Sequence, residues 1–320
     1  IIAEVGINHN GKFSLAKRLV QECKKIGADA VKFQTFKAEN VISKFAKKLK
    51  YQKIKKKDNQ SQLEMLKSYE LTDNEFYKLK KYCEKKNIIF MSTPKDLKSA
   101  RFLKKINMKI FKIGSGEANN YELIKKISNY RRKTIVSTGM CTLKEVDKIY
   151  KIFKGKKRNN LSLLHCTSLY PCPEDNCNLL AISSMKKKFN VEIGFSDHTI
   201  GFDASLGAVS LGSKIIEKHI TLNKSMRGPD HKASLDPKEF KKFVEKIRSM
   251  EKLLGNSKKN PSIKEKKVIK FIRRGLVYST DMKVGSLLTY KNIQIKRPMI
   301  GLKPEDKSKI IGKKLNQRVL

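Results

Sequence analysis

Apolar runs of strand length alternate with amphipathic stretches of helix length from residue 1 to residue 254. Short, mostly apolar runs predict buried strands, and apolar residues at a spacing of three and four predict helices. The predicted strands span residues 1–6, 30–36, 88–93, 108–113, 134–139, 161–167, 192–197 and 215–221. The predicted helices span residues 13–26, 73–86, 97–105, 121–128, 143–153, 179–189, 204–211 and 237–254.

Eight strand–helix units in series predict an α/β fold with a closed parallel sheet, the (β/α)8 or TIM barrel. A doubly wound open sheet is the alternative. The barrel makes the sharper prediction, because its strand-to-helix loops all open on one face, where functional residues collect. Polar residues at the predicted strand ends are Asn8, His9, Lys32, Gln34, Ser92, Thr93, Lys112, Ser115, Glu117, Ser137, Thr138, His165, Thr167, Ser196, Asp197, His198, Glu217 and His219.

The pattern changes after residue 255. Residues 256–266 are rich in lysine, asparagine, serine and proline, and they predict a linker. Short β-type runs separated by turn residues then occupy residues 275–279, 286–288 and 293–296. The predicted organisation is therefore a barrel over residues 1–255, a linker, and a small β-rich domain over residues 267–320.

One connection inside the barrel is unusually long. Residues 36–71 separate the second predicted strand from its helix and are rich in lysine and amide side chains. A stretch of this length exceeds an ordinary loop. We interpret it as a lid over the barrel mouth, and an unpacked excursion is the alternative.

The chain is strongly basic. Its 320 residues carry 72 Lys and Arg against 30 Asp and Glu, a formal net charge of +42. Such a balance points to nucleic acid or an anionic membrane surface. The lysines recur through every predicted helix instead of forming one arginine-rich patch with aromatic residues, which favours compositional bias on solvated faces. Nucleic-acid binding is retained as the alternative function of another class.

Cysteine use and hydropathy bear on the compartment. The six cysteines contain no C-x-x-C pair, and a chain of this size needs no disulfide, so reduced thiols are expected and a zinc cluster is not. No apolar run approaches the length of a membrane span, and no signal peptide is visible. A cytoplasmic protein is the resulting prediction. Because the sequence opens on Ile1, a short N-terminal piece is expected to be missing.

Two histidines end neighbouring predicted strands. His198 follows the seventh strand and His219 lies in the eighth. Adjacent strands are about 5 Å apart, so two imidazoles at matching height can bind one divalent ion and leave coordination positions open for a substrate carbonyl. Hydrogen-bonded core histidines are the alternative interpretation, and His9, His165 and His231 are not assigned to either.

Two lysines, Lys32 and Lys112, are predicted to point into the same mouth. Ammonium groups beside several hydroxyls suit a ligand that carries a phosphate and a carboxylate. Glu117 shares a glycine-rich corner with Lys112 and is the candidate acid or base. The competing chemistry is a Schiff-base aldolase. The hydroxyl donors expected beside the lysines are Thr93, Ser115, Ser137 and Ser196.

An ordered set of motifs resembles the sialic acid synthase family. The motifs are AEVGINHNG at residues 3–11, VKFQT at 31–35, FKIGSGE at 111–117, STGM at 137–140, LHCTSLYP at 164–171, GFSDHT at 194–199 and GPDH at 228–231. Members of that family condense phosphoenolpyruvate with an N-acetylated hexose to give nine-carbon 2-keto acids. The resemblance covers nearly the whole chain, because the part after the linker resembles the antifreeze-like (SAF, β-clip) domain of those enzymes.

The resemblance implies a role for each candidate residue. His198 and His219 would bind manganese or magnesium, and Glu117 would handle the proton of the attacking water, with Glu4 and Glu217 as alternatives. Phosphoenolpyruvate would be held by Lys32, Thr93, Lys112, Ser115, Ser137 and Ser196. The sugar would contact Gln34, Tyr170 and Asp230, together with Arg297 from the small domain of a partner subunit, which implies a domain-swapped homodimer.

The identity of the sugar acceptor follows less directly. The leading prediction is N-acetylmannosamine, which gives N-acetylneuraminate. The alternative is 2,4-diacetamido-2,4,6-trideoxymannose, which gives legionaminate, or the corresponding precursor of pseudaminate. Two departures from the family pattern lie on the sugar side: Ser168 stands where some neuraminate synthases have asparagine, and Arg227 stands where proline is common.

Overall fold

The computed structural model describes residues 1–48, 52 and 61–317. The chain divides into two compact units, Ile1–Gly255 and Asn256–Leu320. The first unit holds all of the polar strand ends identified above, and Arg297 belongs to the second unit. The second contains the predicted small domain.

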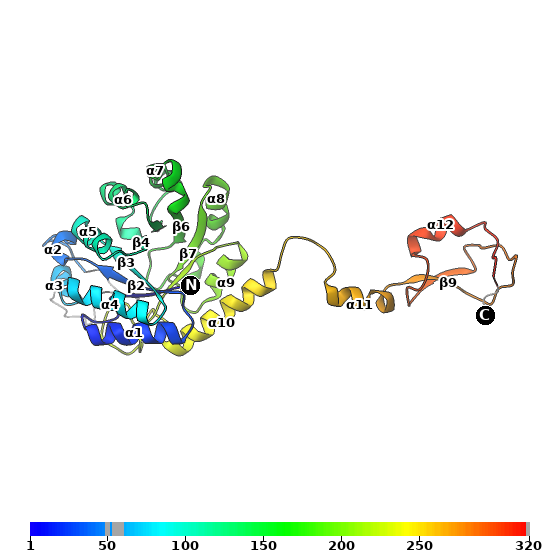
Figure 1. Ribbon diagram of the computed structural model, residues 1–320, viewed down its shortest axis with the longest axis horizontal. Helices are drawn as coiled ribbons and strands as arrows, with labels where there is room; N and C mark the ends of the chain where they lie inside the picture. Colours follow the sequence, from blue (N-terminus) through cyan, green and yellow to red (C-terminus); the bar gives the residue numbers. More distant parts are fainter. Residues whose placement is uncertain (49–51, 53–60, 318–320) are drawn as a thin grey trace. The chain divides into compact units, whose positions relative to one another are not determined.

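The first unit is a closed barrel of eight parallel strands in sequential order (Figure 1). Closure comes from β8, which pairs in parallel with β1 through Ile2–Glu217 and Glu4–His219. The predicted barrel is confirmed, and the open-sheet alternative is wrong. The strands are β1 (Ile2–Gly6), β2 (Ala30–Thr35), β3 (Ile89–Pro94), β4 (Ile110–Ile113), β5 (Lys133–Ser137), β6 (Leu161–Cys166), β7 (Glu192–Asp197) and β8 (Ile216–His219).

Helices surround the barrel (Figure 1). Capping boxes define the starts of several of them, as at Thr72 with Glu75 and at Asp236 with Glu239. Their apolar faces pack on the outer face of the sheet, where Phe33, Phe111 and Phe195 are buried. The helices are α1 (Phe13–Lys25), α2 (Ala38–Val41), α3 (Gln62–Lys67), α4 (Asp73–Lys85), α5 (Leu97–Lys105), α6 (Tyr121–Ser128), α7 (Leu143–Ile152), α8 (Leu180–Lys188), α9 (Asp203–Ser210) and α10 (Pro237–Leu254).

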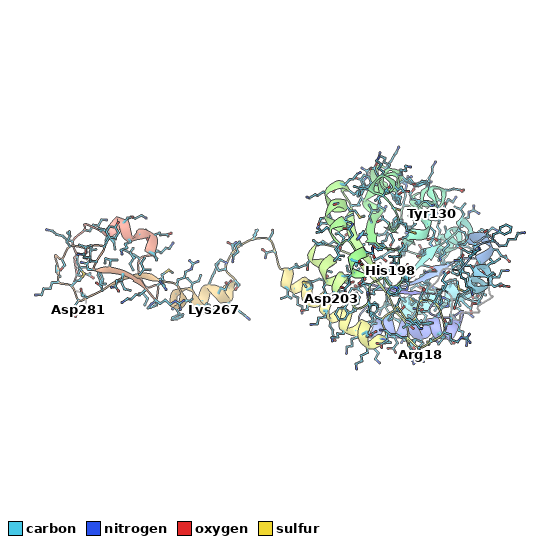
Figure 2. All side chains as sticks on the ribbon, turned by 180° about the vertical axis from the view of Figure 1, so that it is seen from behind. Arg18, Tyr130, His198, Asp203, Lys267 and Asp281 are labelled. Atoms are coloured by element: carbon cyan, nitrogen blue, oxygen red, sulfur yellow. The ribbon has the colours of Figure 1, made fainter. Side chains whose placement is uncertain are left out.

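The alternation of side chains along each strand sorts the polar strand ends into two groups. Glu217 and His219 line the cavity at the barrel mouth, and Figure 2 shows His198 inside the ring of helices. Asp197 and His165 instead lie on the outer layer, where Asp197 pairs with Lys218 and His165 bonds the carbonyl of Cys177. The expectation that the polar strand ends collect at the mouth is therefore wrong for these two, and five further residues do not line the cavity either: Asn8, His9, Ser92, Thr138 and Thr167.

The described parts of the long connection pack against the barrel. α2 and α3 form a separate apolar cluster in which Met65 is almost completely buried. Residues 49–51 and 53–60, at the centre of the predicted lid, lie outside the described residues. The lid interpretation therefore stays a prediction. The buried members of the cluster are Ile7, Phe36, Ala38, Met65, Leu66 and Tyr69.

The second unit contains α11 (Ile263–Ile272), β9 (Gly275–Tyr278), β10 (Ile293–Lys296) and α12 (Lys307–Ile310). β9 and β10 pair antiparallel, whereas the run predicted at 286–288 forms only an isolated bridge between Leu287 and Lys314. α11 begins inside the stretch predicted as a linker. In the part of the chain that the structure describes, no helix is long and apolar enough to cross a membrane. The small core consists of Met282, Leu288, Ile293 and Leu315.

Candidate active site

A cavity of about 300 Å³ lies at the carboxyl ends of the barrel strands. It is the place where the barrel fold brings its strand-to-helix loops together. Asp230 is not part of its wall, and Arg297 belongs to the second unit. The predicted residues that line it are Glu4, Lys32, Gln34, Thr93, Lys112, Ser115, Glu117, Ser137, Tyr170, Ser196, His198, Glu217 and His219.

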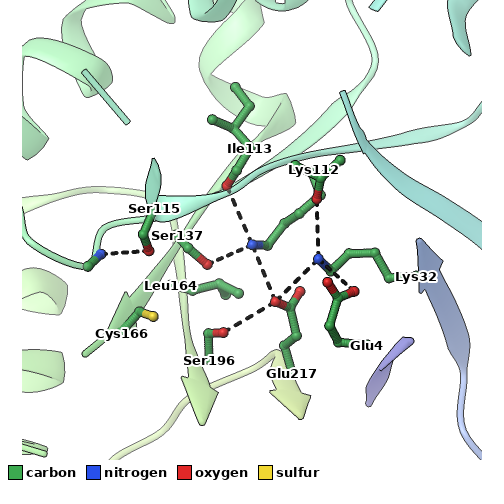
Figure 3. A network of polar contacts seen from close by, with 12 residues as sticks. Glu4, Lys32, Lys112, Ile113, Ser115, Ser137, Leu164, Cys166, Ser196 and Glu217 are labelled. Atoms are coloured by element: carbon green, nitrogen blue, oxygen red, sulfur yellow. Dashed lines mark hydrogen bonds and ion pairs between the residues drawn. The ribbon is translucent and has the colours of Figure 1, made fainter. Parts of the chain in front are cut away.

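Two lysines and two glutamates form a buried network on the cavity floor (Figure 3). The Nζ of Lys32 lies 2.8 Å from Glu4 Oε2 and 3.6 Å from Glu217 Oε1, and the Nζ of Lys112 lies 3.4 Å from the same oxygen of Glu217. Burial alone would raise the pKa of Glu217, but Lys112 and Lys32 lower that pKa to about 2. Glu217 therefore stays ionised. Its negative charge, together with Glu4, offsets the positive charge of the two lysines before any ligand binds.

Three hydroxyl groups lie beside this network. Thr93 Oγ1 accepts from Lys32 at 3.2 Å, Ser137 Oγ accepts from Lys112 at 2.7 Å, and Ser115 Oγ accepts from the backbone of Gly139 at 3.0 Å. Because the oxygens of Thr93 and Ser137 are acceptors here, their own O–H groups remain for a ligand oxygen. The Ser115 hydroxyl is in addition hydrogen-bonded to the Cys166 thiol. Ser196 differs, since its hydroxyl donates to Glu217 at 3.2 Å.

Gly139 makes the position of Ser115 possible. A Cβ at this residue would lie 2.7 Å from Ser115 Oγ and 2.3 Å from Ser168 Oγ, both closer than real contacts. A glycine is therefore required for the backbone N–H to approach the Ser115 hydroxyl.

Glu117 occupies a different environment from the other two glutamates of the site. It is half-buried in the turn after β4, and a Cβ on Gly114 would lie 2.7 Å from its Oε2, so Gly114 leaves room for the carboxylate. Among the described residues, no lysine or arginine forms an ion pair with Glu117. Burial, opposed by Lys32, raises the pKa of Glu4. Among the described residues, Glu117 is thus the glutamate of the cavity wall that forms no ion pair with a lysine.

The rings of His198 and His219 lie side by side, with centroids 5.5 Å apart. His198 Nδ1 is 2.7 Å from the carbonyl oxygen of Thr167, which fixes that nitrogen as the donor and leaves Nε2 as the ligand atom. His219 Nδ1 is buried without a hydrogen-bond partner. Burial and the neighbouring His198 hold the pKa of His219 well below its usual value, so it is a neutral imidazole.

A divalent cation fits this pair. Neutral imidazoles are metal ligands, and the orphaned nitrogen of His219 is a buried group that still needs a partner. Asp230 Oδ2 lies 3.9 Å from His219 Nδ1. Within residues 1–48, 52 and 61–317, no group of three or more His, Cys, Asp or Glu side chains is arranged to hold a metal ion. A cation at the histidine pair would therefore keep open positions for substrate.

The residues predicted to contact the sugar are only partly brought together. Gln34 donates to Glu4 Oε1 at 3.1 Å, and the ring of Tyr170 lies 4.1 Å from that of His198. Burial, and then the nearby Glu4, raises the pKa of Asp230 to about 6. Arg297 is an exposed residue directly after β10 in the second unit.

Sequence reasoning missed three residues of the cavity wall, Lys95, Met140 and Cys166. Lys95 is half-buried, and its Nζ lies 5.3 Å from the centre of the Phe36 ring. The signal available was its position two residues after Thr93, at the end of β3. Cys166 ends β6, and its Sγ lies 3.8 Å from His198 Nδ1. In the sequence it was one of six similar thiols.

Comparison with known proteins decides the family. A profile of the NeuB family matches residues 19–259, three quarters of the chain's length. The chain belongs to the NeuB family. A profile of the SAF domain matches residues 273–320 of this NeuB protein, so the resemblance noted in the sequence is confirmed in both parts.

Several relatives of this NeuB protein are named synthases, and it is an enzyme of the same transferase type. It is 44% identical to the N,N'-diacetyllegionaminic acid synthase of Campylobacter jejuni over 98% of this chain and 94% of that protein. It is 36% identical to the pseudaminic acid synthase of the same species, over 100% and 93%. The crystal structure of the N-acetylneuraminic acid synthetase of Leptospira borgpetersenii, in complex with citrate, matches with a TM-score of 0.76 and 35% identity, covering 84% of this chain and 89% of that one.

Proposed function

We propose that this enzyme condenses phosphoenolpyruvate with an N-acylated amino hexose and releases phosphate. The observation that carries the proposal is the convergence, in one cavity, of the lysine–glutamate network, three hydroxyl groups and two neighbouring histidine rings. The first two suit a phosphorylated carboxylate, and the third suits a Lewis-acidic cation. The synthase relatives support the same reaction class.

The hydroxyls and lysines give phosphoenolpyruvate its binding site. Thr93, Ser115 and Ser137 donate to its oxygens, and the oxygens of Thr93 and Ser137 accept from Lys32 and Lys112. Lys32 and Lys112 supply positive charge, and Glu4 and Glu217 keep the network near neutrality when the ligand is absent. The anion thus enters a site whose donors are already oriented.

The acceptor reacts as its open-chain aldehyde. His198 and His219 would hold manganese or magnesium, which would supply Lewis acidity toward the aldehyde oxygen. C3 of phosphoenolpyruvate forms the new bond to the aldehyde carbon, and C2 becomes an oxocarbenium centre. The Tyr170 ring against His198, together with Gln34 and Asp230, orients the sugar.

Water then completes the reaction. It adds to C2 and gives up a proton to Glu117, the glutamate of the cavity wall without a lysine partner. The tetrahedral intermediate breaks the C–O bond to phosphate, so the bridging oxygen leaves with the phosphate and the water oxygen becomes the ketone. The products are a nine-carbon 2-keto acid and inorganic phosphate.

Two acceptors are candidates. N-acetylmannosamine gives N-acetylneuraminate, as in the name of the 35%-identical synthetase. The alternative, 2,4-diacetamido-2,4,6-trideoxymannose, gives legionaminate and is favoured by the 44%-identical relative. The pseudaminate precursor has the support of the 36%-identical synthase.

A domain-swapped homodimer is part of the proposal. Arg297 would reach the N-acyl group of the sugar in the barrel of the partner subunit. Exposed apolar side chains on the second unit are consistent with a surface covered by another chain. These side chains are Ile263, Phe271, Ile272, Val284, Leu287, Tyr290 and Ile300. A cytoplasmic location also belongs to the proposal, because free thiols suit a reducing compartment.

The test is formation of a 2-keto acid and phosphate from phosphoenolpyruvate with each sugar in parallel, with manganese or with a chelator. The proposal expects both products with at least one sugar and none with the chelator. His198→Ala, which keeps the fold, should give no turnover. Full activity in this variant would contradict the metal assignment, and no product from any of the three acceptors would contradict the reaction.

A further inference from the structure

An ion pair lies directly behind the two histidines, on the outer layer of the barrel. Asp197 ends β7 and directly precedes His198, Lys218 precedes His219 on β8, and Asp197 and Lys218 are paired across the strands. Lys218 Nζ lies 2.9 Å from Asp197 Oδ2, and both side chains are at most 1% exposed. The next positions on both strands turn inward and carry the imidazoles.

Lys218 contacts the residues on both sides of His198, the side chain of Asp197 and the backbone of Thr199. Besides Asp197, its Nζ donates to the carbonyl oxygen of Thr199 at 2.8 Å. The other oxygen of Asp197 accepts from the N–H of Thr199 at 2.8 Å and from its hydroxyl at 2.7 Å. The segment that carries His198 is therefore tied to the strand that carries His219 at two points.

A barrel does not need an ion pair at this place. One pair earlier on the same outer layer, Phe195 lies opposite Ile216, and both are buried apolar residues. Desolvation of two charges offsets most of their attraction, and apolar residues of similar volume stabilise a core as well or better. Unlike apolar packing, a hydrogen-bonded ion pair fixes the distance and the direction between its two charged groups.

We propose that Asp197 and Lys218 form a clamp that holds His198 and His219 at the separation needed to share one divalent cation. Both are positioning residues, since neither reaches the cavity. The inference rests on the proposed metal site, and it predicts that the clamp sets the affinity of the metal itself, before substrates bind.

The test measures Mn²⁺ binding to the full chain without substrates, by the electron paramagnetic resonance signal of the free ion. Lys218→Met removes the ammonium, and the double variant Asp197→Asn with Lys218→Met removes both charges, so no buried charge is left unpaired. We expect both to bind Mn²⁺ at least about tenfold more weakly, the usual effect of losing an outer support of a metal ligand. Circular dichroism checks that each variant is folded.

The matched control is Lys133→Met. It removes one positive charge and an ion pair between β5 and β7, Lys133 with Glu192, on an exposed part of the barrel. Its Mn²⁺ affinity should equal that of the wild type, which excludes an effect of net charge alone.

The outcomes separate the two levels of the proposal. If the wild type binds no Mn²⁺, the metal site and the clamp both fail. If the wild type binds and the folded double variant binds within twofold of it, the clamp alone fails. A double variant that does not fold would equally overturn the clamp, because the pair would then support the barrel as a whole.

Discussion

The charges of the cavity are distributed unevenly among its lysines. Lys32 and Lys112 are each within ion-pair distance of a glutamate, whereas no ion pair reaches Lys95 from the described residues. An anionic ligand gains most from a cation that is not already compensated. We therefore expect the positive charge of Lys95 to contribute to the binding of phosphoenolpyruvate.

Replacing Lys95 with methionine should raise the KM for phosphoenolpyruvate by about 10- to 100-fold, because one charge-assisted hydrogen bond contributes about 1.5–3 kcal/mol. The KM for the sugar should change little. Steady-state kinetics with each substrate varied in turn gives both values. Lys98→Met, on the exposed face of α5, is the control for net charge. A changed sugar KM with an unchanged phosphoenolpyruvate KM would place Lys95 on the acceptor side instead.

The buried imidazole of His9 makes the free energy of unfolding depend on pH. Burial lowers its pKa from 6.5 to about 4, and its Nδ1 accepts the backbone N–H of Gly11, which a protonated ring cannot do. Because the pKa of His9 is lower in the folded state, neutral His9 contributes its full stability above the pKa of the unfolded state. That stability is lost as the pH falls toward the pKa of the folded state. Protonation of His9 should lower the free energy of unfolding of the wild type by about 2 kcal/mol between about pH 7 and pH 5.

Urea unfolding of the wild type and of His9→Gln, at both pH values, measures that loss. The variant should show the smaller decrease, by about 2 kcal/mol. The remaining decrease includes His231, whose pKa is also lowered to about 4. An equal decrease in the free energy of unfolding of the two proteins would show that His9 is not the source of this pH dependence.

Individual site residues were predictable only where strand ends are easy to recognise. Lys112 and His219 follow from apolar runs with a polar residue at the end, and both line the cavity. The direction of Asp197 was not predictable, because a shift of one residue in register sends a side chain to the opposite face. Lys95 was missed because it lies beyond the strand, where no periodicity applies.

Among the elements, the eight strand–helix pairs were predicted and the short helices were not. α2 has four residues and α3 has six, too few for a helical period to be recognised. α3 did carry a usable signal, since Ser61 and Glu64 form a capping box at its start. Burial of Met65 and Leu66 against Phe36, rather than local propensity, holds this helix on the barrel.

Removing the side chain of Met65 should therefore destabilise the first unit. Met65→Ala leaves a cavity in the cluster of α2 and α3, and the free energy of unfolding should fall by about 2–5 kcal/mol. Met140→Ala is the matched control, because Met140 is 74% exposed. Chemical denaturation of the full chain gives both values. Equal small changes would mean that this cluster does not hold the connection in place.

The whole molecule consists of two compact units, and the reaction is proposed to need both. The division into units was visible in the sequence as a change of pattern. The contact of Arg297 with a partner subunit was implied only by the family resemblance, because a single chain carries no record of contacts between copies. His198 is in the first unit and Arg297 in the second. In a domain-swapped dimer, the two residues of one active site come from different chains.

Mixing two inactive variants tests this arrangement. His198→Ala and Arg297→Ala should each be nearly inactive, and subunit exchange between them should restore about a quarter of the wild-type rate, since half of the dimers are mixed and each has one complete site. Size-exclusion chromatography confirms that dimers form. If subunits exchange and activity does not recover, Arg297 acts on the barrel of its own chain or takes no part in the active site.

The fate of the bridging oxygen of phosphoenolpyruvate tests the central claim most directly. Phosphoenolpyruvate labelled at that position with a heavy oxygen isotope is incubated with enzyme, Mn²⁺ and the accepted sugar, and mass spectrometry follows the label. The account predicts that all of the label appears in inorganic phosphate and that the ketone oxygen of the product comes from water. Label retained in the 2-keto acid would mean cleavage of the P–O bond and would contradict the proposed reaction.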